Sequence, residues 1–429
     1  MPMTEVRLFE AGDNLQAPQG ANFRISDLPD DLEVIPVNLV AADGGPSKGL
    51  FYRKRGASLR VGVHLMHPRT DQSQNYNVIP LAQAGFGVLA RASRWPNNDA
   101  TTVHEVLTLD VASGVQFLRD QGCARVVLLG NSGGGTLATF YQSQARTAPP
   151  GRLTDTPAGD PFDLNRFDLP AADAVVIVGG HVGEGLLLGR MIDPAVVDEN
   201  DPLATDPELD LYDPRNGFRM PPDSSHFSDE FLERYQLAQI DRVRRIDAKA
   251  LSLVADQRQA AEMIPRSTGA AATRLERASH MGWFMVIYRT TADPAAVDLH
   301  IDPDDRRVQS YTGSRPDLEN YGENGFARYV TPRAWLSTWS AISGRARTAD
   351  NLAGIPDPTL IVHYAGDAGC RMADANALYG ASAATDKELA VVRHADHYGI
   401  ALNSDSSRGP RTSEGTQKVV EWLTERFQA

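Results

Sequence analysis

The sequence predicts an α/β protein with a mostly parallel sheet and helices on both of its faces. Short apolar runs alternate with segments of helical periodicity over about the first 180 residues. Two of these runs, "VVLL" and "AVVIV", contain no polar residue, which is typical of central parallel strands buried on both faces. The same alternation resumes near the C-terminus. Strands and helices that alternate in this way pack as a parallel sheet between helices.

The expected elements of the first part begin with an antiparallel strand pair, "EVIPVNLVA" and "GLFYRK", and a third strand, "RVGVHLMH". A short helix closed by Gly85 ("VIPLAQAG") and a strand ("FGVLARAS") come next. The segment "TTVHEVLTLDVASGVQFLRDQG" is an amphipathic helix with a Thr cap and a Gly stop. Then "ARVVLLG" is a strand, "TLATFYQSQA" a helix and "AADAVVIVGGH" a strand. Near the C-terminus, "PTLIVHYAGD", "ADANALYGAS", "KELAVVRHADH" and "GTQKVVEWLTERF" predict strand, helix, strand and helix.

A long stretch rich in Asp, Pro, Arg and Asn separates the two parts. A chain of 429 residues is long for a single core, so we expect a core made of residues 1–181 and 330–429 and a cap inserted at residues 182–329. Within the cap, the amphipathic stretch from "DEFLERYQ" to "AAEMI" predicts more than one helix, while "WFMVIYRT" and "AAVDLHID" predict strands. The charge run Arg242, Arg244 and Arg245 is interpreted as a solvated face or as ion pairs within the cap.

The composition excludes several classes of protein. Hydrophobic residues make up 42% and charged residues 23%, as in ordinary soluble domains. The net charge of −13 repels phosphate backbones and argues against a nucleic-acid partner. The first sixteen residues contain no basic segment followed by an apolar one, so we expect no secretory signal, and no apolar run reaches membrane-spanning length. Two cysteines, Cys123 and Cys370, form neither a disulfide framework nor a cysteine-rich metal site. We therefore expect a cytoplasmic protein without a membrane partner, with homo-oligomerisation left open.

The segment "VVLLGNSGGGTLATFYQ" allows two interpretations. A strand, a glycine-rich turn and a helix can hold a phosphate at the helix N-terminus. However, several strands precede this turn, no acid follows about 20 residues later, and the phosphate-loop lysine is missing. The alternative is G-x-S-x-G, in which Gly130 and Gly133 to Gly134 flank Ser132 and expose its hydroxyl above the sheet. A glycine-rich strand end with a chance serine is the remaining explanation.

Two residues further along the chain favour the nucleophile. A serine hydroxyl needs an imidazole to take its proton, and the imidazole needs an acid to orient it. Asp367 ends one predicted strand and His397 follows the next. Because ligands and catalytic groups collect at the carboxyl ends of parallel strands, we expect Ser132, Asp367 and His397 to meet there.

With the elbow "GNSGGG", the acid in "PTLIVHYAGD" and the histidine in "RHADHYG", the sequence resembles the α/β-hydrolase family, over about 280 residues of core. The order serine, acid, histidine is the order of that family. The resemblance implies a mostly parallel sheet with a cap after the sixth strand. It also implies an acyl-enzyme mechanism in which Ser132 is the nucleophile, His397 the base and Asp367 the orienting acid, with no cofactor.

The resemblance further implies an oxyanion hole. Its first amide is that of Gly133, and its second comes from the loop after the third strand, "LMHPRTDQS", where His67-Pro68 would place the Arg69 amide, with Thr70 as the alternative. The Arg69 side chain could hold a substrate carboxylate or form a surface salt bridge.

Other residues near the expected site have open roles. Asn131, His181 and Trp95 are candidates for the substrate pocket, although structural roles explain His181 and Trp95 equally well. Asp396 is an alternative acid, but an immediate neighbour of His397 is poorly placed to bond its ring. The sequence "HADH", with His394, suggests a metal, yet a zinc site needs three or four ligands and no second His/Asp cluster is evident in the sequence. We therefore predict no metal.

The expected activity is hydrolysis of a small-molecule carboxylic ester. Thioester, lactone, amide or carbon–carbon bond hydrolysis would use the same residues, and an acyltransferase or a binding protein that kept the fold without turnover is an alternative. The insertion should select the substrate, because fold and triad alone do not. Its aromatic residues offer material for an apolar pocket or for the core of the cap, namely Trp283, Phe284, Tyr288, Tyr311 and Tyr321.

Overall fold

The computed structural model describes residues 22–309, 313–402, 408–411 and 413–428. Its centre is an eight-stranded sheet in the order β1-β2-β4-β3-β5-β6-β11-β12. The edge strands β1 (Leu32–Val40) and β2 (Pro46–Lys54) are antiparallel to each other, and β2 is antiparallel to β4 (Gly87–Arg91). From β4 to β12 (Lys387–Val392) all neighbours run parallel. This confirms the predicted fold class.

The remaining elements of the core include the predicted ones in their expected order, together with short elements that were not predicted. These are β3 (Val61–Met66), α1 (Val78–Gln83), α2 (His104–Asp120), β5 (Arg125–Asn131), α3 (Gly133–Arg146), β6 (Ala174–Val178), α10 (Thr348–Leu352), β11 (Thr359–Tyr364), α11 (Met372–Ala381), β13 (Ile400–Leu402), β14 (Arg408–Arg411) and α12 (Glu414–Phe427), with the 3₁₀ turns η1 (Ile25–Asp27) and η2 (Leu164–Arg166). The expected Thr cap of α2 is wrong, because Val103 holds that position without a side-chain cap.

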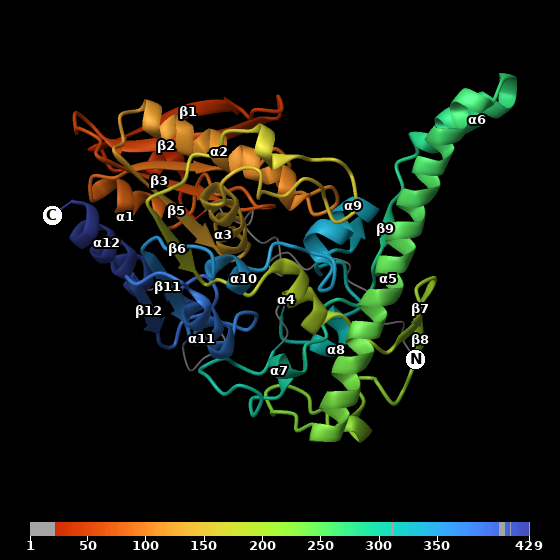
Figure 1. Cartoon of the computed structure of the whole chain (residues 1–429). Helices are drawn as coiled ribbons and strands as arrows, with labels where there is room; N and C mark the ends of the chain where they lie inside the picture. Colours follow the sequence, from red (N-terminus) through yellow and green to blue (C-terminus); the bar gives the residue numbers. More distant parts are fainter. Residues whose placement is uncertain (1–21, 310–312, 403–407, 412, 429) are drawn as a thin grey trace.

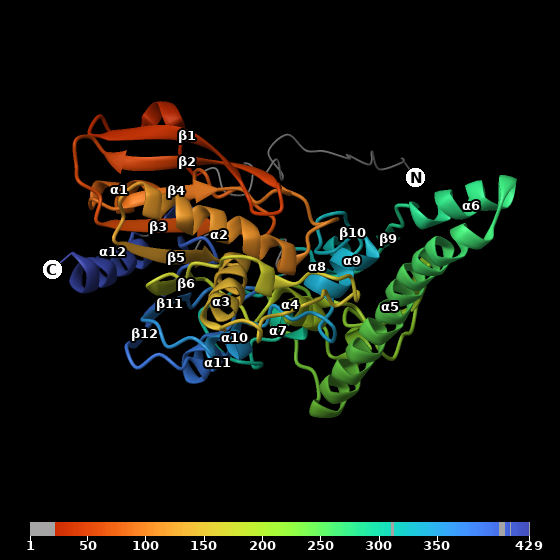
Figure 2. The same cartoon turned by 45° about the horizontal axis from the view of Figure 1, so that its top comes forward.

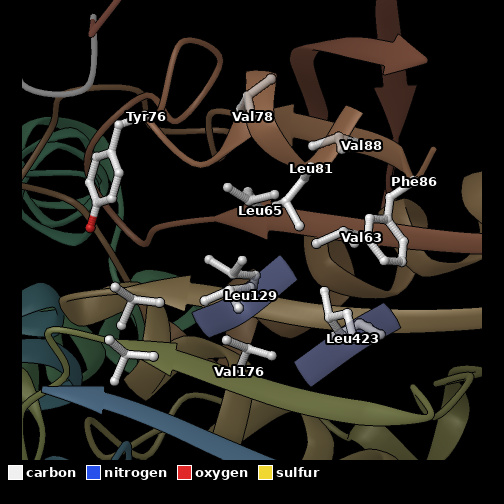
Figure 3. Close-up of a cluster of buried hydrophobic side chains, with 14 of the residues drawn as sticks. Val63, Leu65, Tyr76, Val78, Leu81, Phe86, Val88, Leu129, Val176 and Leu423 are labelled. Atoms are coloured by element: carbon white, nitrogen blue, oxygen red, sulfur yellow. The ribbon is translucent and has the colours of Figure 1, made fainter. Parts of the chain in front are cut away.

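Two apolar layers sandwich the sheet. Successive residues of a strand point to opposite faces, so Val127 and Leu129 of β5 pack against α1 and α12, whereas Val126 and Leu128 pack against α2 and α3. Figure 3 shows the first layer, in which Leu81 of α1 approaches the strand side chains. Because the central strands are apolar on both faces, helices must cover both, and the carboxyl ends of the strands are left at one edge to carry function.

The insertion folds as a layer of its own beside this edge (Figure 1). Its elements are α4 (Glu184–Met191), β7 (Val196–Asp198), β8 (Asp201–Thr205), η3 (Pro214–Asn216), α5 (Asp229–Met263), η4 (Ile264–Arg266), α6 (Gly269–Ser279), β9 (Met285–Val286), α7 (Pro294–Val297), α8 (Pro316–Glu319), β10 (Tyr329–Val330), α9 (Pro332–Ala334) and the π-helical turn η5 (Trp335–Trp339). One buried cluster joins Leu188, Val243 and Ile246 to Trp335 and Trp339, so the insertion has its own apolar core.

The predicted end of the cap at residue 329 needs correction. It falls within β10, which pairs with β9. The following turn also belongs to the insertion, since the indole of Trp335 donates a 2.6 Å hydrogen bond to Asp247 in α5. The segment returns to the core near Thr348, whose amide donates to the carbonyl of Val182 at 2.9 Å. The two ends of the insertion therefore lie side by side.

Three details inside the insertion also differ from the predictions. The long amphipathic stretch is one helix of 35 residues, α5, rather than several. The segment "WFMVIYRT" contributes only the two residues of β9, and "AAVDLHID" begins with the short helix α7, capped by the Asp293 side chain, instead of forming a strand. The charge run, in contrast, forms ion pairs within the insertion, which is one of its two interpretations: Arg242 is buried and paired with Glu199 at 2.8 Å, and Arg244 forms an exposed pair with Asp241.

The far end of α5 and the whole of α6 extend away from the body of the molecule, as both views show (Figures 1 and 2). Buried positions of α5 recur every three or four residues as far as Val254, and beyond it only Ala260 is buried. No residue of α6 is buried. Across the part of the chain that the structure describes, none of the helices has the length and hydropathy needed to cross a membrane.

Candidate active site

Ser132 occupies the sharp turn between β5 and α3. Its backbone has φ +56° and ψ −127°, a conformation that side-chain-bearing residues rarely adopt. Its amide donates to the carbonyl of Val178 at 2.9 Å, and its own carbonyl accepts from Gly135 at 2.9 Å. Such strain persists only where the surroundings enforce it, and it collects at functional sites.

The glycines of this turn let three segments approach closely. A Cβ on Gly130 would lie 2.2 Å from the backbone of Gly134, and one on Gly134 would lie 2.6 Å from the carbonyl oxygen of Met66 at the end of β3. A Cβ on Gly135 would meet the Ile177 side chain at 2.8 Å. The residues that made the motif recognisable are therefore the ones that let α3 begin directly against β3 and β6.

His397 and Asp367 meet beyond the ends of β12 and β11. The imidazole Nδ1 lies 2.5 Å from Oδ2 of Asp367, and both side chains are buried. The other oxygen of Asp367 accepts the amides of Gly369 and Cys370, at 2.8 and 3.0 Å. Asp367 is thus fixed on both oxygens, and it fixes the ring of His397.

Burial and charge act against each other in this pair. Burial lowers the pKa of His397, but the charge of Asp367 and its hydrogen bond outweigh burial and raise that pKa above its ordinary value. For Asp367, burial raises the pKa, whereas the charge of His397, its hydrogen bond and the two amides bring the pKa below its ordinary value. Both shifts favour a negative Asp367 beside a basic imidazole.

In the sheet, β4 lies between β2 and β3, and all strands from β4 to β12 run parallel. A strained serine follows β5, an acid follows β11 and a histidine follows β12, as in α/β hydrolases. The chain has the α/β-hydrolase fold.

The solved structures to which this chain is similar share little sequence with it. No protein-family model matches the sequence, and no curated protein matches it. A hypothetical protein of Pseudomonas aeruginosa is 14% identical, with a TM-score of 0.45, over 93% of this chain and 95% of that one. An α/β hydrolase from Penicillium sp. sh18 is 12% identical, with a TM-score of 0.45, over 92% and 100%. An esterase of Pyrococcus furiosus is 11% identical, with a TM-score of 0.42, over 95% and 97%.

A cavity of this α/β-hydrolase fold brings Ser132 and His397 together. Its other lining residues are Asn22, His67, Arg69, Thr70, Gln72, Asn75, Tyr76, Asn131, Phe326 and Tyr398. Most come from the loop after β3, whose amide-rich sequence "DQSQNYN" was the available signal for Gln72 and Asn75. Phe326 comes from the insertion, far away in the sequence, and no local pattern marked it.

Asn131 lies in the cavity wall, as predicted for the pocket, and its side-chain amide also forms hydrogen bonds at the carboxyl ends of the strands. Its Nδ2 donates to the carbonyl of Val178 at 2.9 Å, and its Oδ1 accepts from Asn75 at 3.3 Å. His181 and Trp95 do not line this cavity. His181 accepts the Gly183 amide at 3.1 Å, and Trp95 packs against the second apolar layer, so both have structural contacts of their own.

The loop after β3 corrects the predicted oxyanion hole. The amides of Arg69 and Thr70 both donate to Nδ1 of His67, each at 3.1 Å. Neither amide therefore points at the Gly133 end of α3, where the second donor was expected. The physical reason is the side chain of His67, which captures the two amides that the resemblance assigned to the substrate.

The Arg69 side chain is held by protein partners. Its Nη1 lies 2.8 Å from Oδ1 of Asp99, and its guanidinium stacks over the rings of Phe326 and Trp339, with 5.2 and 4.9 Å to the ring centroids. These contacts join the core loop to the insertion.

The aromatic residues expected to form an apolar pocket lie elsewhere. Trp283, Phe284 and Tyr321 are exposed, and neither they nor Tyr288 line the cavity. Tyr311 lies outside the described residues. The prediction was wrong because aromatic content marks neither the face nor the segment that reaches Ser132; the insertion reaches it through Phe326 instead.

A buried carboxylate lies beside the start of α3. Oε1 of Glu184 is 2.3 Å from the position that a Cβ on Gly133 would take. His104 Nε2 approaches Oε2 to 3.4 Å, but obliquely, and neither carboxylate oxygen has a hydrogen-bond donor among the described side chains and backbone. Burial raises the pKa of Glu184, yet the charge and hydrogen-bonding capacity of His104, with the charges of His181 and Arg69, lower it to about 2. Glu184 is therefore a carboxylate at neutral pH.

Asp396 and His394 do not join this site. The Asp396 carboxylate accepts hydrogen bonds from the amides of Tyr398 and Ile400, both at 2.9 Å, and so stabilises the turn that contains it. His394 is exposed and lies 3.5 Å from Asp305.

Within the described ranges, two groups of side chains have donor atoms close enough to share a metal ion. One group consists of Asp367, Cys370 and His397. The hydrogen bonds of Asp367 to the Cys370 amide and to the His397 ring explain why these three residues lie close together. His226, Asp298 and His300 form the other, on the insertion surface, where His300 Nδ1 lies 2.9 Å from Asp298. The sequence did not indicate this second cluster, because 72 positions separate His226 from Asp298.

Proposed function

We propose that the protein is a serine hydrolase that cleaves a small-molecule carboxylic ester through an acyl-enzyme. One observation carries the proposal: a strained serine at the head of α3 shares a cavity with an imidazole whose Nδ1 is 2.5 Å from a buried carboxylate. A serine, an oriented base and an orienting acid are the groups that acyl transfer requires.

In the proposed reaction, the Ser132 hydroxyl attacks the acyl carbon while Nε2 of His397 takes its proton. The carbonyl electron pair moves to oxygen, and the amide of Gly133 donates to that oxyanion. Collapse of the tetrahedral intermediate expels the alkoxide, which takes the proton from His397. Water then attacks the acyl-enzyme with His397 as base, and Ser132 recovers its proton. Asp367 keeps the Nδ1 proton in place and stabilises the imidazolium.

The residues 182–346 are proposed as the cap that selects the substrate. Phe326 in the cavity wall and the stacking of Arg69 against Phe326 and Trp339 support this role. A cavity walled by both core and insertion favours small molecules over polymers. Thioesters, lactones and amides remain alternative substrates, because the same groups would cleave them.

The deciding experiment is labelling with a fluorophosphonate, in which the serine oxygen displaces fluoride from phosphorus. We expect one label, mapped by mass spectrometry to Ser132, and none in Ser132→Ala. The variant should keep its fold and lose at least about 10⁴ in kcat on a short-chain aryl ester. Labelling elsewhere, or turnover by Ser132→Ala above about a hundredth of the wild-type rate, would reject Ser132 as nucleophile.

A further inference from the structure

The proposed oxyanion hole needs a second donor, and the two loop amides that were expected to provide it donate to a protein side chain instead. The second donor must therefore be another group of the cavity. The amides of Arg69 and Thr70 serve the imidazole of His67. The Gly133 amide lies in the first turn of α3, where the helix itself offers no acceptor. A single donor is a weak oxyanion hole, since losing one donor costs a factor of about 10² to 10³ in kcat.

The hydrogen bonds of His67 define its tautomer. Nδ1 accepts two N–H groups at 3.1 Å, so it carries no hydrogen, and the hydrogen of the neutral ring is on Nε2. Burial, followed by the charge of Arg69, lowers the pKa of His67 well below its ordinary value, although the charge of Glu184 acts in the opposite direction. The ring therefore stays neutral at pH 7 and presents Nε2–H as a donor.

The position of Nε2 is beside the proposed oxyanion hole. It lies 3.0 Å from the point that a Cβ on Gly133 would occupy, and Cβ is bonded to the same Cα as the Gly133 amide nitrogen. The His67 side chain lines the cavity that contains Ser132. Nε2 has no hydrogen-bond partner among the described residues, and part of its surface is accessible to solvent. Its donor is thus open to the cavity.

We propose that the Nε2–H of His67 is the second oxyanion donor, acting together with the amide of Gly133 on the acyl oxygen of the substrate. This inference rests on the proposed acyl-transfer function. No proton moves in this step: the carbonyl pair moves onto the oxygen, the oxygen accepts hydrogen bonds from His67 and Gly133, and the pair returns when the intermediate collapses. A neutral imidazole suits the task, because it donates a hydrogen bond without protonating the oxyanion.

Glu184 lies beside this arrangement. Its Oε1 lies 2.3 Å from the same Cβ point that Nε2 approaches to 3.0 Å. The two side chains form no hydrogen bond, and the carboxylate acts on the His67 ring through its charge, which opposes the effect of burial on the pKa of His67. The carbonyl oxygen of a substrate therefore meets a donor that no described acceptor occupies.

Two substitutions of His67 separate donation from loop support. In His67→Asn, Oδ1 can still accept the loop amides, but the side chain is too short to reach the position of Nε2. In His67→Gln, the side-chain amide can reach that position, but the acceptor at Nδ1 is lost. If His67 is an oxyanion donor, His67→Asn should lower kcat by a factor of about 10² to 10³ with little change in KM. The kcat of His67→Gln should then be at least about tenfold higher than that of His67→Asn.

A matched control is His64→Gln, which removes another buried imidazole of β3, packed against Gly114 of α2. We expect this variant to keep kcat within about threefold, even if it loses some thermal stability. Fluorophosphonate labelling of Ser132 should persist in all three variants, so a failure of the inference is distinguishable from a failure of the proposed function, which would abolish labelling in the wild type.

A boronic acid that forms a tetrahedral adduct on Ser132 provides the readout that a structural role would not affect. Its affinity should fall with His67→Asn by the same factor as kcat/KM, because the adduct imitates the charged intermediate. In the ¹⁵N-labelled wild type, the Nε2–H resonance of His67 should shift when the adduct forms. An unmoved resonance would overturn the inference, as would an Asn variant with near-normal kcat beside a damaged Gln variant.

Discussion

At the scale of single residues, Asp367 determines both the orientation and the basicity of His397. The carboxylate is held by two amides and touches Nδ1 of the ring, so the ring cannot turn without breaking that contact. Its charge is also what raises the pKa of an imidazole that burial alone would lower. The two effects can be separated by removing the charge while keeping the shape.

Asp367→Asn should lower kcat by about 10⁴, because the amide favours the wrong tautomer of His397. It should also move the acidic limb of kcat/KM to lower pH. In the wild type the pKa of His397 is raised, so activity is lost as pH falls through a value above the ordinary 6.5; without the charge, burial remains and lowers the pKa. A pH–rate profile of both proteins tests this.

The control is Asp396→Asn, which removes a nearby charge but keeps the turn oxygen that accepts the Tyr398 amide. If Asp396→Asn causes the large loss and Asp367→Asn a mild one, Asp367 is not the acid.

The residues of the site differ in how much the sequence could predict. Ser132, Asp367 and His397 were predictable as one group because each follows a parallel strand, and strand ends meet at one edge. The roles of His67 and Arg69 were not, because they depend on which acceptor a loop amide finds. That choice depends on a side-chain rotamer and not on spacing. Phe326 depends on how the insertion packs, which no local pattern contains.

At the scale of elements, the β5–α3 turn depends on the absence of a side chain at Gly134. A Cβ there would lie 2.6 Å from the backbone oxygen of Met66, and a backbone atom cannot move aside cheaply. The turn and the end of β3, which leads into the loop of His67, are therefore fitted to each other.

Gly134→Ala should destabilise the protein by about 1–3 kcal/mol through overpacking and should also reduce kcat/KM, since α3 and the Gly133 amide must shift. A urea-unfolding midpoint and ester kinetics measure the two effects. Gly380→Ala is the matched control: this glycine is exposed on α11, with nothing within 4 Å of the added Cβ. It should be neutral or stabilising by up to about 1 kcal/mol. Equal effects of the two substitutions would contradict this explanation.

Helices and strands were predicted correctly where the spacing of apolar residues determines the structure. They were predicted wrongly where neighbouring residues or tertiary packing determine it. The buried strands β5 and β6 follow directly from their apolar runs. The continuity of α5 was missed because its exposed, polar far half gives no packing reason to continue or to stop. In "AAVDLHID", β-compatible residues form a helical turn because Asp293 and Pro294 precede them, a cap and a first-turn proline that outweigh the apolar pattern.

At the scale of the whole molecule, buried neutral histidines should make the fold sensitive to acid. Burial lowers the pKa of His64, His67, His181 and His363, that of His181 to about 4. Below about pH 6.5 the unfolded chain binds protons at these positions that the folded chain does not, so the free energy of unfolding decreases as pH falls. His397 has the opposite sign, because its folded pKa is raised.

We predict that the urea midpoint decreases as the pH is lowered from 7 to 5, because the free energy of unfolding decreases with a limiting slope of about 1.4 kcal/mol per pH unit for each such histidine. Below about pH 4, Glu184 adds to the loss, since its folded pKa is about 2 and its protonation removes stability. Equilibrium unfolding at a series of pH values is the measurement. A midpoint that stays constant or rises toward pH 5 would contradict the prediction.

The two ends of the insertion meet at one backbone contact, from Thr348 to Val182, and this has an evolutionary consequence. A segment that leaves and re-enters a fold at one point can be gained, lost or exchanged by recombination without changing the length of any core strand. Glu184 opens α4 just inside that junction and touches Gly133. A lineage that acquired a different segment would therefore also change the residue beside Gly133, so the proposed cap and the charge at the start of α3 would be inherited together.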